Sequence, residues 1–175
     1  MSMMPLDGKP PAPVGPARGA YRAARAFVRG VKVVFFRRVL GMDIGDNVRI
    51  DRGARLDFTY PRGVHVGDGA AIAYGAIVFT HDLSRLLHTD TWIGRNCLIG
   101  AKAIVMPGVR IGDFCIVESG AVVTRDVPAG SIVAGNPAVI VRSGIRTGLH
   151  GRLDDDGSDG AGGKPTPSKA TRAAQ

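Results

Sequence analysis

The chain has 175 residues, enough for one compact domain. It contains 25 glycines, and aromatic residues make up only 6% of it, which favours short strands and tight turns over a bundle of helices. The formal net charge of +8 comes without a nucleic-acid-binding motif or a basic face interleaved with aromatic residues, so we expect no nucleic-acid partner.

The first 42 residues differ in composition from the middle of the chain. Residues 1–20 hold most of a proline, glycine and alanine cluster, which predicts a disordered arm. In residues 21–42 apolar side chains recur at three- and four-residue steps, with arginine and lysine opposite, which predicts an amphipathic helix. The apolar positions are Tyr21, Ala24, Phe27, Val28, Val31, Val34 and Phe35.

Two roles for this helix stay open. Its apolar face either caps the open end of the main domain or lies on an anionic membrane surface, which would bring the protein to the inner face of the membrane. No secretory signal is visible, and the longest apolar run near the start, residues 33–36, is far shorter than the ~20 residues of a membrane span. We therefore expect a cytoplasmic protein.

The middle of the chain repeats every six residues, which is typical of a solenoid. Four groups of three repeats predict four triangular coils of 18 residues each, stacked at ~4.8 Å, over residues 43–143. The fold class is therefore an all-β parallel β-helix. The repeats begin at Ile44, Ile50 and Leu56; Val66, Ile72 and Val78; Ile93, Ile99 and Val105; and Ile111, Val117 and Val123.

Two further positions of each repeat follow the same rhythm. The fifth is small or branched and should point inward, whereas the fourth is commonly Gly or Asn, residues that tolerate positive φ at a corner. Cys97 and Cys115 are both fifth-position residues, so we expect free thiols stacked in the core. Residues 144–175 lose the period and are rich in Gly, Pro, Ser and Thr, which predicts a disordered tail.

The repeats, followed by Ala134-Gly135-Asn136-Pro137-Ala138, resemble the hexapeptide-repeat acyltransferases, nearest to the sugar O-acetyltransferase (maltose and galactoside acetyltransferase) branch. This resemblance implies the left hand of the β-helix, which periodicity alone does not fix. It also implies a homotrimer with acetyl-CoA in the groove between subunits. The implied reaction is acetyl transfer to a hydroxyl of a sugar or glycan precursor, as in polysaccharide biosynthesis.

Two insertions interrupt the repeats, and interruptions of a repeat are where function is usually found. Residues 61–65 form the first; the second follows Phe79-Thr80-His81-Asp82 and runs to Thr91. His81 occupies a fourth position, so its imidazole should project from a corner, where it can accept a proton from an attacking hydroxyl. The resemblance implies that His81 is the catalytic base.

Three other residues are candidates for the acceptor side. Asp82 could orient His81, although adjacent residues on an extended chain point in different directions. Asp57 resembles the polar acceptor-site residue of the preceding coil in the family, and His88 lies in the loop where it could touch the acceptor.

For acetyl-CoA the resemblance implies contacts from six residues. Trp92 would pack near the pantetheine arm. The amides around Arg95 and Ser119 would meet the thioester or the polar groups of the pantetheine, and they could stabilise a tetrahedral oxyanion. Thr124 and Arg125 match a Thr-Lys or Thr-Arg pair near the nucleotide, and Arg142 matches a residue that meets a phosphate. Relatives often carry Lys or Arg soon after the Asn-Pro pair, where this chain has Ala138-Val139.

Other functions remain open at this point. A zinc hydratase on the same scaffold would need three converging histidines, which the spacing of His65, His81 and His88 does not supply, so we expect no metal. The acceptor could be a non-sugar alcohol, a drug hydroxyl or an amino-sugar nitrogen. A scaffold without catalytic activity is a further alternative.

Overall fold

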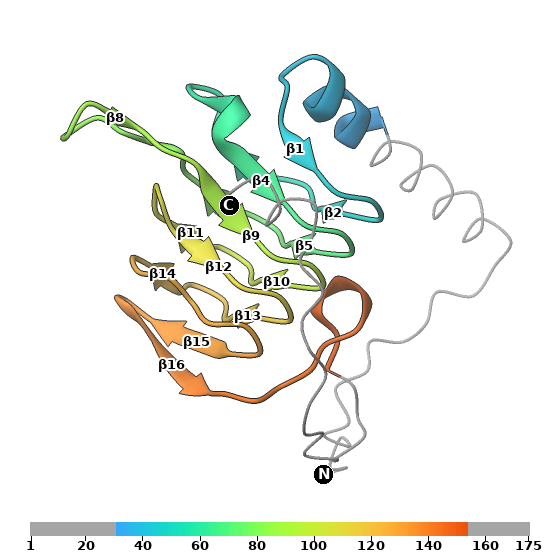
Figure 1. Ribbon diagram of the computed structural model, residues 1–175, viewed down its shortest axis with the longest axis vertical. Helices are drawn as coiled ribbons and strands as arrows, with labels where there is room; N and C mark the ends of the chain where they lie inside the picture. The colour runs from blue at the N-terminus through green and yellow to red at the C-terminus, as the bar shows by residue number, and fades with distance from the viewer. Residues whose placement is uncertain (1–30, 154–175) are drawn as a thin grey trace, which may run out of the picture.

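The computed structural model describes residues 31–153, which form a left-handed parallel β-helix with a helix at its N-terminal end. Figure 1 shows the coils stacked one upon the next from β1 to β16. Three sheets of parallel strands form the sides of the prism, and each of the four predicted coils adds one strand to each sheet. Two further strands, β15 and the antiparallel β16, extend the second sheet.

The first sheet contains β1 (Asp43–Ile44), β4 (Val64–Val66), β9 (Thr91–Ile93) and β12 (Arg110–Ile111). The second contains β2 (Arg49–Ile50), β5 (Ala71–Ile72), β10 (Leu98–Ile99), β13 (Ile116–Val117), β15 (Ile132–Gly135) and the antiparallel edge strand β16 (Ala138–Arg142). The third contains β3 (Arg55–Leu56), β6 (Ile77–Val78), β11 (Ile104–Val105) and β14 (Val122–Val123).

The strand register confirms the predicted repeats. The four residues that begin the groups, Ile44, Val66, Ile93 and Ile111, pair in sequence along the first sheet. The other eight pair in the same way along the second and third sheets, and all twelve are buried. A six-residue period thus fixed both the strands and their partners.

The fifth and fourth positions also behave as predicted. Cys97 and Cys115 are fully buried free thiols, one coil apart, and the amide of Cys115 lies 3.4 Å from Sγ of Cys97. Corners are turned by residues with positive φ, among them Asn47, Gly53, Gly69, Gly75, Asn96, Gly108 and Gly120. Small inward residues are needed because the interior of the triangle is narrow.

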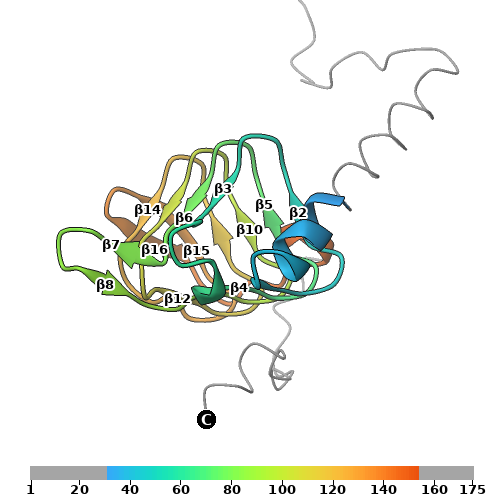
Figure 2. The same cartoon turned by 90° about the horizontal axis from the view of Figure 1, so that it is seen from above.

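Residues 31–38 are helical and cover the first coil (Figures 1 and 2). Phe36, only 4% exposed, joins the core, and Val33 and Leu40 pack against it. Arg37 donates to the carbonyls of Ile44 and Gly45. The helix therefore caps the stack, one of its two expected roles.

The expectation for the capping face, however, is wrong. Val31, Val34 and Phe35, which belong to the predicted apolar face, are 54%, 56% and 44% exposed. The opposite side of the helix, with Phe36, packs on the coil instead. Residues 21–30 of the predicted helix lie outside the described residues, as does the arm of residues 1–20.

Residues 144–153 are ordered, which corrects the predicted disordered tail for this part; residues 154–175 lie outside the described residues. The segment ends in the short 3-10 helix η2 (Leu149–Gly151) and packs over the second sheet. Thr147 is buried and donates its hydroxyl to the carbonyl of Asn96 at 2.6 Å. A Cβ on Gly151 would lie 2.4 Å from Cβ of Leu98, so the two chain segments are in close contact.

No helix among the described residues is long and apolar enough to cross a membrane.

Candidate active site

The two insertions meet at the corner between the third and first sheets. The first contains the short 3-10 helix η1 (Pro61–Gly63), and the second is a hairpin of β7 (His81–Asp82) and β8 (Leu87–His88) that extends away from the stack (Figure 2). Tyr60, before η1, stacks on His88 with ring centroids 5.4 Å apart. The corner is therefore lined by both insertions.

Thr80 anchors the base of the hairpin. It is fully buried, its hydroxyl donates to the carbonyl of Tyr60 at 2.7 Å, and its carbonyl accepts the amide of Thr89 at 2.8 Å. Thr91 holds the other end, because its hydroxyl donates to the carbonyl of Phe79 at 2.6 Å. His81 thus starts from a fixed backbone, and its side chain is 17% exposed.

Asp57, which follows β3 one coil earlier, is a buried carboxylate directly beside His81. Its Oδ1 accepts the amide of Thr59 at 2.8 Å. Its Oδ2 accepts the amides of Thr80 at 2.8 Å and His81 at 3.1 Å and also contacts Nδ1 of His81. Burial raises the pKa of Asp57, but the hydrogen bonds from Thr80, His81 and Thr59 outweigh burial and lower the pKa to about 2.

This contact determines the tautomer of His81. An ionised carboxylate can only accept hydrogen bonds, so Nδ1 of His81 carries the proton that it donates to Asp57. In the neutral imidazole, Nε2 therefore carries the lone pair. The corner thus holds an imidazole that is oriented by a buried carboxylate and whose Nε2 can accept a proton.

Asp82 does not take part in this pair. Its Oδ1 accepts the amide and the hydroxyl of Ser84 at 2.9 and 2.6 Å and the amide of Arg85 at 3.2 Å. These hydrogen bonds, chiefly that of the Ser84 hydroxyl, lower the pKa of Asp82. Asp82 therefore shapes the hairpin turn. The residue that orients the imidazole of His81 is Asp57, not Asp82.

His88 is brought next to His81. The two residues are directly opposite each other in the antiparallel hairpin, a position that places side chains on the same face of the ribbon. His88 is exposed, and its ring lies over Tyr60. The sequence pattern did not single out Tyr60; its place immediately before the first insertion is the only signal that could have done so.

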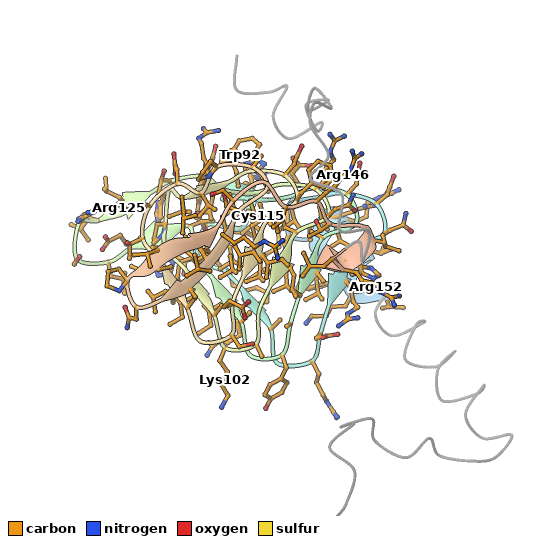
Figure 3. The ribbon with its side chains drawn as sticks, turned by 90° about the horizontal axis from the view of Figure 1, so that it is seen from below. Trp92, Lys102, Cys115, Arg125, Arg146 and Arg152 are labelled. Carbon is orange, nitrogen blue, oxygen red and sulfur yellow. The ribbon has the colours of Figure 1, made fainter. Side chains whose placement is uncertain are left out.

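Trp92 lies on the outer face of the first sheet (Figure 3). Its ring stacks on His65 at 3.6 Å between centroids, with 5° between the planes, and the guanidinium of Arg110 lies 5.1 Å from the ring centroid. Its indole nitrogen is buried and has no hydrogen-bond partner among the described residues. His65 itself contacts Asp43 at 3.1 Å, so it belongs to this stack and not to the His81 corner.

Arg95 and Ser119 lie on the other two corners of the triangle. The amide of Arg95 donates to Oδ1 of Asp113 at 2.9 Å, and its guanidinium forms an ion pair with the same carboxylate at 3.1 Å. The Arg95 amide is therefore not free to stabilise an oxyanion, contrary to our expectation. Ser119 is exposed in the turn between β13 and β14.

Thr124 and Arg125 lie on the same corner as His81, two coils farther along, which corresponds to roughly 10 Å at the usual strand spacing. Figure 3, which looks along the stack, shows Arg125 at this corner and Lys102 at another. Arg125 and Arg142 are exposed and form no ion pair within residues 31–153. Both guanidinium groups can thus meet an anion from solvent.

Within residues 31–153 no three or more His, Cys, Asp or Glu side chains are grouped as metal ligands would be.

Three comparisons with known proteins bear on this site. A family model described as the hexapeptide repeat of succinyl-transferase matches residues 91–125. "Putative acetyltransferase YvoF" of Bacillus subtilis (strain 168) is 33% identical over 116 residues, 64% of this chain and 66% of that protein. A 2,3,4,5-tetrahydropyridine-2,6-dicarboxylate N-acetyltransferase of Staphylococcus aureus is 42% identical over 84 residues, 48% of this chain and 32% of that protein. The chain thus spans just under two thirds of the first relative and about a third of the second.

Among solved structures, a maltose O-acetyltransferase from Clostridium difficile 630 matches with a TM-score of 0.51 and 24% identity, covering 62% of this chain and 72% of that one. The hexapeptide-repeat acetyltransferase VCA0836 from Vibrio cholerae, in complex with acetyl coenzyme A, matches with a TM-score of 0.53 and 20% identity. That match covers 74% of this chain and 90% of the other. These two likenesses establish the shared fold.

Proposed function

Because the chain belongs to the family of hexapeptide-repeat acyltransferases, we propose that it transfers the acetyl group of acetyl-CoA to a hydroxyl of a sugar or glycan precursor in the cytoplasm. The observation that carries this proposal is the contact between Nδ1 of His81 and the buried carboxylate of Asp57. A scaffold without activity would not need a corner histidine whose tautomer is fixed in this way.

The reaction uses His81 as its general base. Nε2 accepts the proton of the acceptor hydroxyl while the hydroxyl oxygen attacks the thioester carbonyl. The new C–O bond forms, the C–S bond breaks, and the proton on Nε2 passes to the departing sulfur to give the free thiol of CoA. Asp57 stabilises the transient imidazolium and keeps the ring oriented, so we assign it as a positioning residue.

The substrates bind on opposite sides of His81. Tyr60 and His88 form the acceptor side, because they stack on each other beside the imidazole. Arg125, with Thr124 beside it on the same corner, offers a cation for the phosphates of CoA. Arg142 pairs with Ile132 at the start of β15 in the second sheet, away from this corner. Like Arg95, Ser119 and Trp92, it would take part only through a neighbouring subunit.

A homotrimer would provide that neighbour. The outer face of the second sheet is covered by residues 144–153. The outer face of the third sheet carries the partly exposed aliphatic residues Ile77, Ile104 and Val122, next to the His81 corner. We propose that this stripe packs against a second subunit and that the site is completed there.

An amine acceptor is a second candidate, because one relative is named an N-acetyltransferase. The same base would then take a proton from the attacking nitrogen, so the corner geometry alone does not separate the two reactions. The test is an acceptor screen with acetyl-CoA that measures released CoA thiol for sugars, simple alcohols and amino sugars, with product analysis by mass spectrometry. A hydroxylamine-labile ester is expected; a stable amide would favour the second candidate, and no thiol release with any acceptor would contradict both.

A further inference from the structure

The helix at the N-terminal end of the stack leaves one apolar face uncovered. Val31, Val34 and Phe35 are each about half exposed, and Val39 in the turn that follows is 65% exposed. On a helix, positions 31, 34, 35 and 38 share one side, opposite Phe36 and Leu40, which pack on the first coil. Nothing within residues 31–153 covers this side.

The charged side chains in the sequence segment that contains this face are all positive. Between residues 21 and 42 there are six cations, Arg22, Arg25, Arg29, Lys32, Arg37 and Arg38, and no acidic residue. Arg37 is used to hold the helix to Asp46 at 3.0 Å, and Lys32 lies over the ring of Phe36. Arg38 is exposed on the uncovered side itself.

These two properties together indicate the partner. A second copy of the chain would bring like charges together, and a purely electrostatic partner would gain nothing from exposed Val and Phe side chains. An anionic lipid surface satisfies both, since apolar side chains enter the boundary between headgroups and acyl chains while Arg and Lys meet the headgroup phosphates. The apolar spacing of Val31, Val34 and Phe35 also continues upstream in the sequence, at Ala24, Phe27 and Val28.

We propose that the face formed by Val31, Val34, Phe35, Arg38 and Val39 docks the protein on an anionic phospholipid surface. The attachment is peripheral, because this face can enter only the outer ~5–10 Å of the bilayer. It also leaves the His81 corner free, since the helix covers the first coil and the hairpin leaves the side of the stack (Figure 2). The inference does not rest on the proposed acetyl transfer.

The experiment is co-sedimentation of the full chain with vesicles of phosphatidylcholine, with and without phosphatidylglycerol, at low and high salt. We expect binding only to the vesicles that contain phosphatidylglycerol and a marked loss of binding at high salt. The double variant Val34→Glu/Phe35→Glu should bind these vesicles at least about tenfold more weakly, because two apolar contacts are lost. Circular dichroism and sedimentation velocity must show that its fold and assembly are those of the native chain.

The matched control is Val139→Glu/Val141→Glu, which places the same two charges on residues of β16 that are 61% and 58% exposed. It should bind vesicles nearly as well as the native chain. The proposal is overturned if the native chain does not bind anionic vesicles, or if both double variants lose binding equally. It is also overturned if the native chain forms a larger assembly that Val34→Glu/Phe35→Glu dissociates, because another copy of the chain would then cover this face.

Discussion

At the scale of single residues, the position of one proton decides what the corner can do. Asp57 is buried yet ionised, because it accepts hydrogen bonds from the amides of Thr59, Thr80 and His81 as well as from the imidazole. The three amides belong to the backbone of two successive coils, so they hold the carboxylate in place independently of the imidazole. His81 then needs no other partner to present Nε2 outward.

Asp57→Asn should reduce kcat on the order of 10² or more, because an amide can accept the Nδ1 proton only in one of its orientations and does not stabilise an imidazolium. The KM for acetyl-CoA should stay the same, since Asp57 lies away from Arg125 and Arg142. Steady-state kinetics with each substrate varied in turn measures kcat and both KM values. An increase in the KM for the acceptor at constant kcat would instead indicate that Asp57 binds the acceptor, as expected from the resemblance.

The lowered pKa of Asp57 also predicts a pH dependence of stability. Its folded-state value of about 2 is below the ordinary 3.8, so ionised Asp57 stabilises the fold above about pH 4, and this contribution disappears as the pH falls through about 2. The shift corresponds to about 2 kcal/mol. Urea unfolding of the native chain and of Asp57→Asn should differ by about that free energy at neutral pH and converge toward pH 2; a gap that does not change with pH would refute the assignment.

At the scale of elements, the six-residue period predicted the positions of the strands and their pairing. The residues that begin each repeat, such as Ile44 and Val66, pair as expected because the period places equivalent positions one strand apart. The contact of His81 with Asp57 was not predictable, since an insertion separates the two coils. The prediction of which side of the helix packs on the first coil was wrong. Periodicity identifies an apolar side of the helix, but it does not show that Phe36, on the other side, fills the end of the core.

The segment of residues 144–153 escaped prediction for a related reason. It has no period, and it is attached by individual contacts, among them the hydroxyl of Thr147 on the carbonyl of Asn96 and the amide of His150 on the carbonyl of Gly69 at 2.7 Å. Such contacts with distant coils leave no local pattern in a sequence.

Two truncations test the role of this segment. A chain that ends at Leu153 should be as stable as the full chain. A chain that ends at Arg146 lacks both hydrogen bonds and uncovers Leu98, so we expect its free energy of unfolding to fall by about 1–3 kcal/mol. Thermal and urea unfolding of the two chains measure the difference; equal stability would show that residues 147–153 are only loosely attached.

At the scale of the whole molecule, the three outer faces of the prism differ. The first carries the stack of His65, Trp92 and Arg110, and the second is covered by the chain itself. The third exposes the aliphatic stripe of Ile77, Ile104 and Val122. This asymmetry is what a trimer would use, because only the third face joins an apolar surface to the His81 corner.

Ile104→Glu should therefore convert a trimer into monomers and lower kcat/KM at least tenfold, because a carboxylate placed in an apolar interface is costly to desolvate. Sedimentation velocity and thiol-release assays measure the two effects. Val139→Glu, on the exposed edge strand, is the control and should remain trimeric. A native monomer with full activity would rule out the shared site.

The most direct test of the central claim compares His81→Ala with His88→Ala in preparations of equal assembly. We predict that His81→Ala lowers kcat by ~10² to 10⁴ while acetyl-CoA binding survives, because only the proton acceptor is removed. His88→Ala should keep most of the turnover and raise the KM for the acceptor. Near-normal turnover of His81→Ala, with loss of turnover in His88→Ala, would contradict the assignment of His81 as the base.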